Sequence, residues 1–255
     1  MKLAKDLYLV GSGGVGISNV TDGNVYLIDG HRELGLVDTG SGVATDRILE
    51  NIRQEGFDVK RIRVILLTHA HYDHSRGIPF IRKETDCRVG IHPKGVEELG
   101  KETAPDHPVS KAGFVGKPVR ADFTFTDGQI VEVGDYKLKV IFSPGHSLDS
   151  ACFVGEINGL RVAFTGDTLA GEGRLGITDA STNFLDYRHS IEKLLADEPE
   201  ALLPGHGLFC VRNAHELIRF AVEVLKQKWS GVLPGGPTFY PRWWLTKYGQ
   251  KILDW

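Results

Sequence analysis

Cysteine, methionine and long hydrophobic runs are all scarce in this chain of 255 residues. The 3 cysteines are odd in number and far apart, so they imply no disulfide framework and instead indicate a reducing, cytoplasmic compartment. No stretch approaches the roughly 20 apolar residues of a bilayer-spanning helix, so no membrane contact is expected. The first residues also lack the apolar core of a secretory signal peptide. The single methionine and few cysteines are weakly typical of a thermophilic source.

An excess of positive charge is also missing. The chain has 30 Lys and Arg against 33 Asp and Glu, which gives a formal net charge of −3. Because affinity for nucleic acid rests largely on a basic electrostatic field, nucleic acid is not the expected partner, although a local basic patch is compatible with this balance. The 41% hydrophobic and 25% charged residues are ordinary values for a globular domain. A small-molecule substrate is the expected partner.

Strand and helix patterns alternate through the first 228 residues. Short apolar or β-branched runs between turns predict strands at 6–10, 24–28, 34–38, 63–67, 129–133, 137–142, 151–155, 161–165 and 201–203. Helical spacing of apolar residues predicts helices at 43–55, 93–99, 185–196 and 214–225. Without a long polar linker, this mixture predicts a single layered α/β domain over residues 1–228. Residues 229–255 are rich in proline and aromatic residues, and we expect this tail to pack on the core or to form an interface, as in a homodimer.

The segment THAHYDH at 68–74 carries the most informative pattern in the sequence. Imidazole and carboxylate together are the ligands of zinc and related first-row ions. Four such groups this close in sequence cannot all reach one small ion. The spacing therefore suits two neighbouring ions, with His69 and His71 facing one and Asp73 and His74 facing the other.

Three further candidate ligands come shortly after predicted strands. His146 follows the strand 137–142 through Ser-Pro-Gly, Asp167 follows 161–165 through one glycine, and His206 follows 201–203 through Pro-Gly. His69 likewise follows the strand 63–67. Ligands gather at the carboxyl ends of strands in α/β sheets, and glycine lets the backbone turn sharply there. This shared context predicts that all these groups meet at one metal site.

In this order, HxHxDH (69–74), PGHS (144–147), GDT (166–168) and PGHG (204–207) resemble the metallo-β-lactamase superfamily, as does VDTG (37–40). The resemblance implies a four-layer αβ/βα sandwich. It also implies that one metal takes His69, His71 and His146, that the other takes Asp73, His74 and His206, and that Asp167 bridges the two. Asp38 would lie outside the ligand set and orient a ligand histidine through a hydrogen bond.

The resemblance further implies hydrolysis with two Zn²⁺ ions per chain, for which iron or manganese would be substitutes. Bound zinc lowers the pKa of its water to near 7, so a metal-bridging hydroxide forms at neutral pH. Asp73 would be the catalytic residue that orients this hydroxide or passes a proton.

The stretch SPGHSLDS at 143–150 is most similar to hydroxyacylglutathione hydrolases, the glyoxalase II enzymes, and so predicts a thioester or ester hydrolase. Those enzymes add a longer helical domain with a basic pair for glutathione, whereas only 49 residues follow His206. Two other activities stay open. One is a mononuclear-iron persulfide dioxygenase, and the other is a small endoribonuclease, to which residues 184–206 are similar. A non-enzymatic metal-binding module is the remaining alternative, although such a protein would be expected to have lost some ligands.

Overall fold

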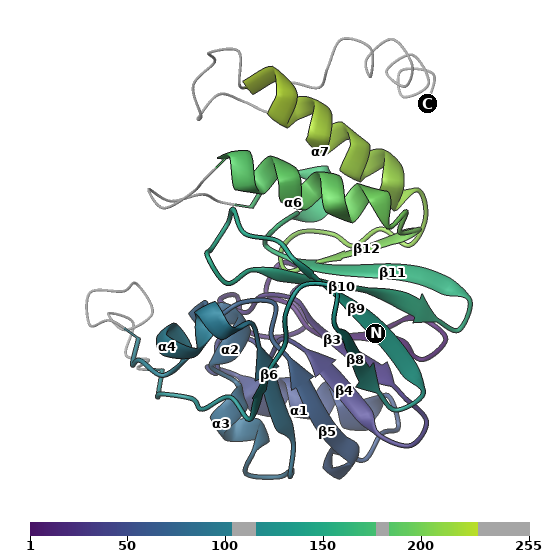
Figure 1. Ribbon diagram of the computed structural model, residues 1–255. Coiled ribbons are helices and arrows are strands. Elements are labelled where there is room, and N and C mark those ends of the chain that lie inside the picture. Colours follow the sequence, from purple (N-terminus) through teal and green to yellow (C-terminus); the bar gives the residue numbers. More distant parts are fainter. Residues whose placement is uncertain (104–115, 177–183, 229–255) are drawn as a thin grey trace.

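Two β-sheets form the centre of the molecule, as the computed structural model shows (Figure 1). It describes residues 1–103, 116–176 and 184–228, so the predicted tail at 229–255 lies outside the described residues. The first sheet has seven strands in chain order: β1 (Lys2–Ala4), β2 (Leu7–Gly11), β3 (Val25–Asp29), β4 (Leu34–Val37), β5 (Ile62–Leu66), β6 (Arg88–Ile91) and β7 (Phe123–Thr124). Strands β1 to β4 pair antiparallel, and β4 to β7 pair parallel.

The second sheet has five strands in the order β12-β11-β10-β9-β8. They are β8 (Ile130–Val133), β9 (Tyr136–Phe142), β10 (Ala151–Ile157), β11 (Leu160–Gly166) and β12 (Ala201–Pro204). Strand β10 is antiparallel to both β9 and β11, while β12 is parallel to β11. Strands β9, β11 and β12 therefore run in the same direction, and their carboxyl ends lie at the same edge of the sheet.

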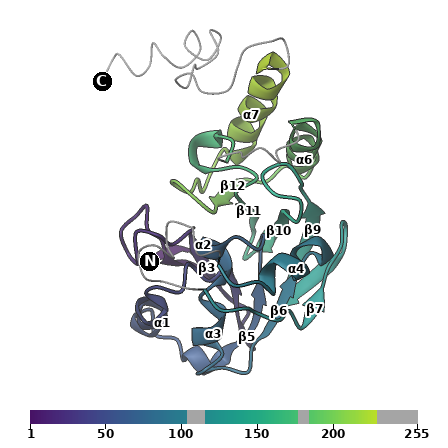
Figure 2. The same cartoon turned by 90° about the vertical axis from the view of Figure 1, so that its left-hand side faces the viewer.

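Helices cover the outer faces of both sheets (Figures 1 and 2). Helices α1 (Thr45–Gln54) and α3 (Ile78–Ile81) pack on the first sheet, and α6 (Phe184–Ala196) and α7 (Ala214–Lys228) pack on the second. The remaining helical elements are short: α2 (Tyr72–Ser75), α4 (Val96–Leu99), η1 (Val59–Arg61), η2 (Pro93–Gly95) and η3 (Gly171–Gly173). The layers are thus helix, sheet, sheet, helix. This confirms the predicted αβ/βα sandwich.

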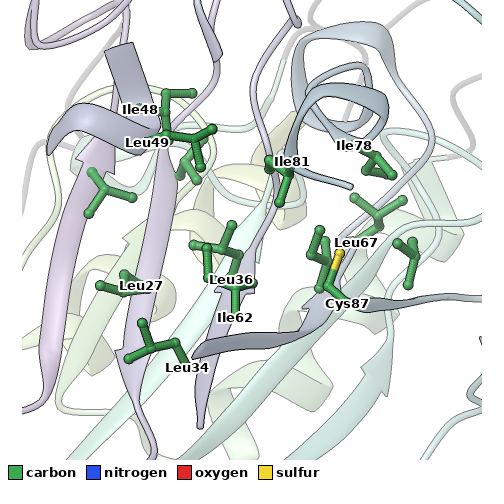
Figure 3. Packing of buried hydrophobic residues seen from close by; sticks show 14 of the residues in the cluster. Leu27, Leu34, Leu36, Ile48, Leu49, Ile62, Leu67, Ile78, Ile81 and Cys87 are labelled. Atoms are coloured by element: carbon green, nitrogen blue, oxygen red, sulfur yellow. The ribbon is translucent and has the colours of Figure 1, made fainter. Parts of the chain in front are cut away.

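Apolar side chains that point alternately to the two faces of a strand hold these layers together. On β2, Leu7 and Leu9 belong to the core between the two sheets, whereas Tyr8 and Val10 belong to the core under α1. Successive side chains of a strand point to opposite faces, so a run that is buried on both faces belongs to a strand between two layers. Figure 3 shows the outer core of the first sheet, where Ile48 of α1 and Ile81 of α3 lie over the strands. The third core joins the second sheet to α6 and α7.

The structure also shows the state of the three cysteines and the character of the helices. Cys87, Cys152 and Cys210 are all free, and the first two are buried. Within residues 1–103, 116–176 and 184–228, no helix combines the length and the apolar character that crossing a membrane requires.

An ion-pair cluster joins three turns from the two sheets. The imidazole of His31, between β3 and β4, has Nε2 3.2 Å from Asp6 Oδ2 and Nδ1 3.0 Å from Asp135 Oδ2. Tyr136 donates a 2.6 Å hydrogen bond to the same Asp6 oxygen. The hydrogen bond with Asp135, followed by that with Asp6, raises the pKa of His31 above its ordinary 6.5. Burial alone would raise the pKa of Asp6, but the hydrogen bonds from Tyr136 and His31 outweigh it and lower that pKa below 3.8.

These two shifts predict a window of pH in which the cluster stabilises the fold. The raised pKa of His31 gives stability that is complete below pH 6.5 and is lost as the pH rises through the folded-state value. The lowered pKa of Asp6 gives stability that is lost as the pH falls below 3.8. We expect His31→Asn, which tolerates the φ of 63° at this position, to lower the free energy of unfolding more near pH 5 than at pH 9. Urea unfolding across this range measures the difference, and an equal loss at both pH values would contradict it.

Candidate metal centre

Four strand ends bring the predicted ligands together. The first ligand segment follows β5 of the first sheet, while His146, Asp167 and His206 follow β9, β11 and β12 of the second. Backbone hydrogen bonds fix these loops on one another, from Ala151 N to Thr68 O at 2.8 Å and from Gly205 N to Gly166 O at 2.8 Å. The site therefore lies at one end of the two stacked sheets.

Asp38, directly after β4, orients His74, the last residue of the first ligand segment. Its Oδ2 accepts a 2.8 Å hydrogen bond from His74 Nδ1. Because a carboxylate only accepts, Nδ1 must carry the proton, so Nε2 presents its lone pair to the site when the ring is neutral. The hydrogen bond that the sequence analysis expected of Asp38 is therefore present.

Thr68 extends this arrangement to a second histidine. Asp38 Oδ1 accepts a hydrogen bond from Thr68 N, and Asp38 Oδ2 accepts one from Thr68 Oγ1, both at 2.8 Å. Since the hydroxyl proton is used there, Thr68 Oγ1 accepts from His69 Nδ1 at 3.0 Å. His69 Nε2 is then left as a lone-pair donor. This role of Thr68 was not predicted from the motif, because a hydroxyl beside a histidine has no distinctive spacing.

The remaining groups meet across the site at short distances. His71 Nδ1 lies 3.0 Å from His146 Nε2, and His206 Nε2 lies 3.0 Å from Asp73 Oδ2. The carboxylate of Asp167 lies between them, with Oδ2 3.5 Å from the Nε2 atoms of both His146 and His206.

Three groups of side chains place their ligand atoms within 4.8 Å of one another. The groups are His69, His71 and His146; His69, His74 and Asp167; and Asp73, His74 and His206. All seven residues that the sequence analysis named are thus brought together. The first and third groups have the same members as the two ligand sets implied by the family resemblance.

The electrostatics of the site follow from burial and from the uneven placement of its carboxylates. Burial, followed by the charges of the neighbouring histidines, lowers the pKa of His69 well below 6.5. Burial alone would also lower the pKa of His74, but Asp73, Asp167 and Asp38 around it raise this pKa to about 10. Burial would raise the pKa of Asp73, yet His74 and His206 outweigh it and hold that pKa well below its usual range. The half of the site around His74 is thus anionic and suited to a cation.

Two orphaned atoms show that the residues fit a metal ion. His69 Nε2 and Asp167 Oδ1 are buried and have no hydrogen-bond partner, and the only ion-pair contact of Asp167 Oδ1 among the described residues is with His74 Nε2 at 3.4 Å. Buried polar atoms are rarely left unpaired, since each costs about 1–3 kcal/mol. A divalent ion would satisfy both, because imidazole nitrogen and carboxylate oxygen are zinc ligands. Gly205 keeps this space clear, because a Cβ there would lie 2.4 Å from Asp167 Oδ1.

Helix α6 supports the loops of the second sheet. Tyr187 Oη donates a 2.9 Å hydrogen bond to Asp167 O and accepts one from Gly176 N. Ser190 Oγ donates to Pro144 O at 2.7 Å, two residues before His146. Both side chains lie at helical spacing with core residues such as Ile191, and only the helix at 185–196 was predicted from the sequence, not these contacts.

Comparisons with known proteins agree with this fold. The profile of the Metallo-beta-lactamase superfamily matches residues 18–206. The chain is 27% identical over 211 residues to an atrochrysone carboxyl ACP thioesterase of Aspergillus fumigatus, covering 82% of this chain and 58% of that protein. It is 32% identical over 174 residues to a hydroxyacylglutathione hydrolase of Hahella chejuensis, covering 65% of this chain and 54% of that protein. The chain spans about half the length of the curated relatives that it matches.

Solved structures share the architecture. A metallo-beta-lactamase with a HARLDQ motif from Cronobacter sakazakii superimposes with a TM-score of 0.66 at 20% identity, covering 100% of this chain and 91% of that one. At this identity the likeness concerns the fold alone, whereas the profile match covers the whole run of ligand motifs. The chain therefore belongs to the metallo-beta-lactamase superfamily.

Proposed function

We propose that this protein is a hydrolase of thioesters or esters that works with two metal ions, Zn²⁺ being the expected one. One observation carries the proposal. His69, His71 and His146 form one compact donor group, and three different residues form another, with the Asp167 carboxylate between the two. A mononuclear site would need only one of these groups.

The names of the relatives support the type of bond. An ACP thioesterase and a hydroxyacylglutathione hydrolase are both named for the cleavage of acyl thioesters. They are similar to 82% and 65% of this chain, respectively. The fold alone would not support this choice, because one fold hosts many activities. The thioester is therefore the first substrate class that we propose.

Different side chains of the site would have different roles in such a reaction. When bound, the metal ions would lower the pKa of a water molecule and polarise the carbonyl of the substrate. Asp73 stays ionised because His74 and His206 hold its pKa low, so its carboxylate can accept a hydrogen bond from the attacking water and orient it. His206 is 44% exposed, whereas His69 and His74 are fully buried, so the substrate would approach from the side of His206.

Metal content and substrate turnover test this proposal together. We expect protein produced with both zinc and iron available to hold two divalent ions per chain by elemental analysis, and to hydrolyse acyl thioesters faster than phosphodiesters. One iron per chain, with oxygen uptake on a persulfide, would replace the proposal by the dioxygenase alternative. Phosphodiester cleavage without thioester cleavage would favour the endoribonuclease. The absence of bound metal would overturn the hydrolase proposal itself.

A further inference from the structure

A buried carboxylate outside the ligand set joins two of the ligand loops. Asp149 is 7% exposed and lies three residues after His146. Its Oδ2 accepts a 2.8 Å hydrogen bond from Ala70 N, and its Oδ1 accepts a 2.7 Å hydrogen bond from Ser147 Oγ. Ala70 lies between His69 and His71, and Ser147 directly follows His146. One side chain therefore links the two chain segments that supply the group of three histidines.

The groups around Asp149 leave its side chain little room to move. A Cβ on Gly95 would lie 2.3 Å from Asp149 Oδ2, so the backbone of η2 closes over this oxygen. Among the described residues no Lys, Arg or His nitrogen lies within salt-bridge distance of Asp149, although its charge acts on the buried imidazole of His92. A buried carboxylate costs free energy unless hydrogen bonds or a nearby cation compensate it. Its two hydrogen bonds supply part of this compensation.

The group of three histidines, His69, His71 and His146, contains no acidic residue. The Asp167 carboxylate, 3.5 Å from His146 Nε2, is shared with the other groups. A divalent ion held by three imidazoles keeps its full charge, and an acidic group just outside the ligands stabilises it. Asp149 is a buried acid next to this group.

We propose that Asp149 is a positioning residue for the metal ion held by His69, His71 and His146. It fixes the backbone between the first two histidines against the loop of the third, and it adds negative charge beside a ligand group whose nearest carboxylate, Asp167, is shared with the other groups. The inference rests on the proposed metal site, and it assigns a role to a residue outside the three donor groups.

Two substitutions separate position from charge. Asp149→Asn keeps both contacts, since the amide oxygen accepts from Ala70 N and the amide nitrogen donates to Ser147 Oγ, whose own proton can go to Ser150 Oγ at 2.7 Å. Asp149→Ala removes the contacts and the charge together. Asp127→Ala is the matched control, because Asp127 also accepts a backbone hydrogen bond, from Phe142 N at 2.8 Å, but lies on the surface.

Cobalt titration of the metal-free proteins is the test, followed by the absorption bands of bound Co²⁺ and by competition with a chromophoric chelator. We expect the wild type and Asp127→Ala to take up two equivalents. We expect Asp149→Ala to bind one of the two about 100-fold more weakly and Asp149→Asn about 10-fold more weakly, within the range for residues that support metal ligands. The bands of only one ion should be lost, and the metal-free Asp149→Asn protein should unfold at nearly the same temperature as the wild type.

The outcomes distinguish the inference from the proposal on which it rests. Wild-type protein that binds no Co²⁺ would overturn the metal site and the role of Asp149 together. If the wild type binds two ions and both Asp149 variants bind them as tightly, the site stands and the inference fails. The inference also fails if both variants weaken the two ions equally and lower the unfolding temperature of the metal-free protein, since that pattern describes a purely structural residue.

Discussion

Alanine at His71 or at Asp73 is expected to abolish turnover and to lower the metal content below two ions per chain. His71 faces His146 at 3.0 Å and Asp73 faces His206 at 3.0 Å, so each substitution removes a donor from a different group. A metal ion contributes several kcal/mol of transition-state stabilisation, and about 4 kcal/mol corresponds to a 10³-fold loss of rate. We therefore expect kcat/KM to fall by at least about 10³-fold for each variant.

The fold should survive both changes. Neither His71 nor Asp73 belongs to the three hydrophobic cores, and both are partly exposed, so their removal leaves no cavity in a packed layer. His215→Ala, at a partly exposed position of α7, is a matched control that should keep full metal content and turnover. The measurements are steady-state kinetics, elemental analysis and circular dichroism on all three variants. Full turnover by both site variants would show that the site has been wrongly assigned.

The clustering of the candidate ligands could be predicted from sequence because these residues stand in short segments at strand ends. Each predicted ligand follows a strand whose apolar run is long enough to be recognised, such as RVILL at 63–67 before His69 or RVAFT at 161–165 before Asp167. Because β9, β11 and β12 point the same way, three of these ends share one edge. The layers were also predictable, since strands buried on both faces and helices with one apolar face allow few arrangements.

The parts that sequence did not predict depend on tertiary contacts. Strand β6 is four residues long and includes Gly90, so its pattern gave no prediction, yet it pairs parallel to β5 and is almost fully buried. The contacts of Thr68, Asp149 and Tyr187 join segments that are far apart in the chain, and no local spacing reveals them. Metal ligands are thus easier to predict than the residues that hold those ligands in place.

Asp38→Ala is expected to have the largest effect on stability of any single change at this site. Asp38 is 2% exposed and accepts three hydrogen bonds, from Thr68 N, Thr68 Oγ1 and His74 Nδ1. Alanine leaves these donors buried and unpaired, and it places a residue that disfavours positive φ at a φ of 61°. Since a buried pair broken on one side costs about 3–5 kcal/mol, we expect a loss of that size in urea unfolding of the metal-free protein.

Asp38→Asn tests whether this carboxylate also sets the direction of the histidines. Asparagine suits the positive φ and can still accept from Thr68 N, but its amide nitrogen would meet Thr68 Oγ1 and His74 Nδ1, which need an acceptor. We expect Asp38→Asn to recover part of the stability while leaving metal affinity well below that of the wild type. Asp58→Ala, which removes only one exposed hydrogen bond from Lys60 N, should change neither quantity much. If Asp38→Ala lost less than about 1 kcal/mol, the hydrogen bonds of Asp38 would not hold the site together, because 1 kcal/mol is the worth of one ordinary hydrogen bond.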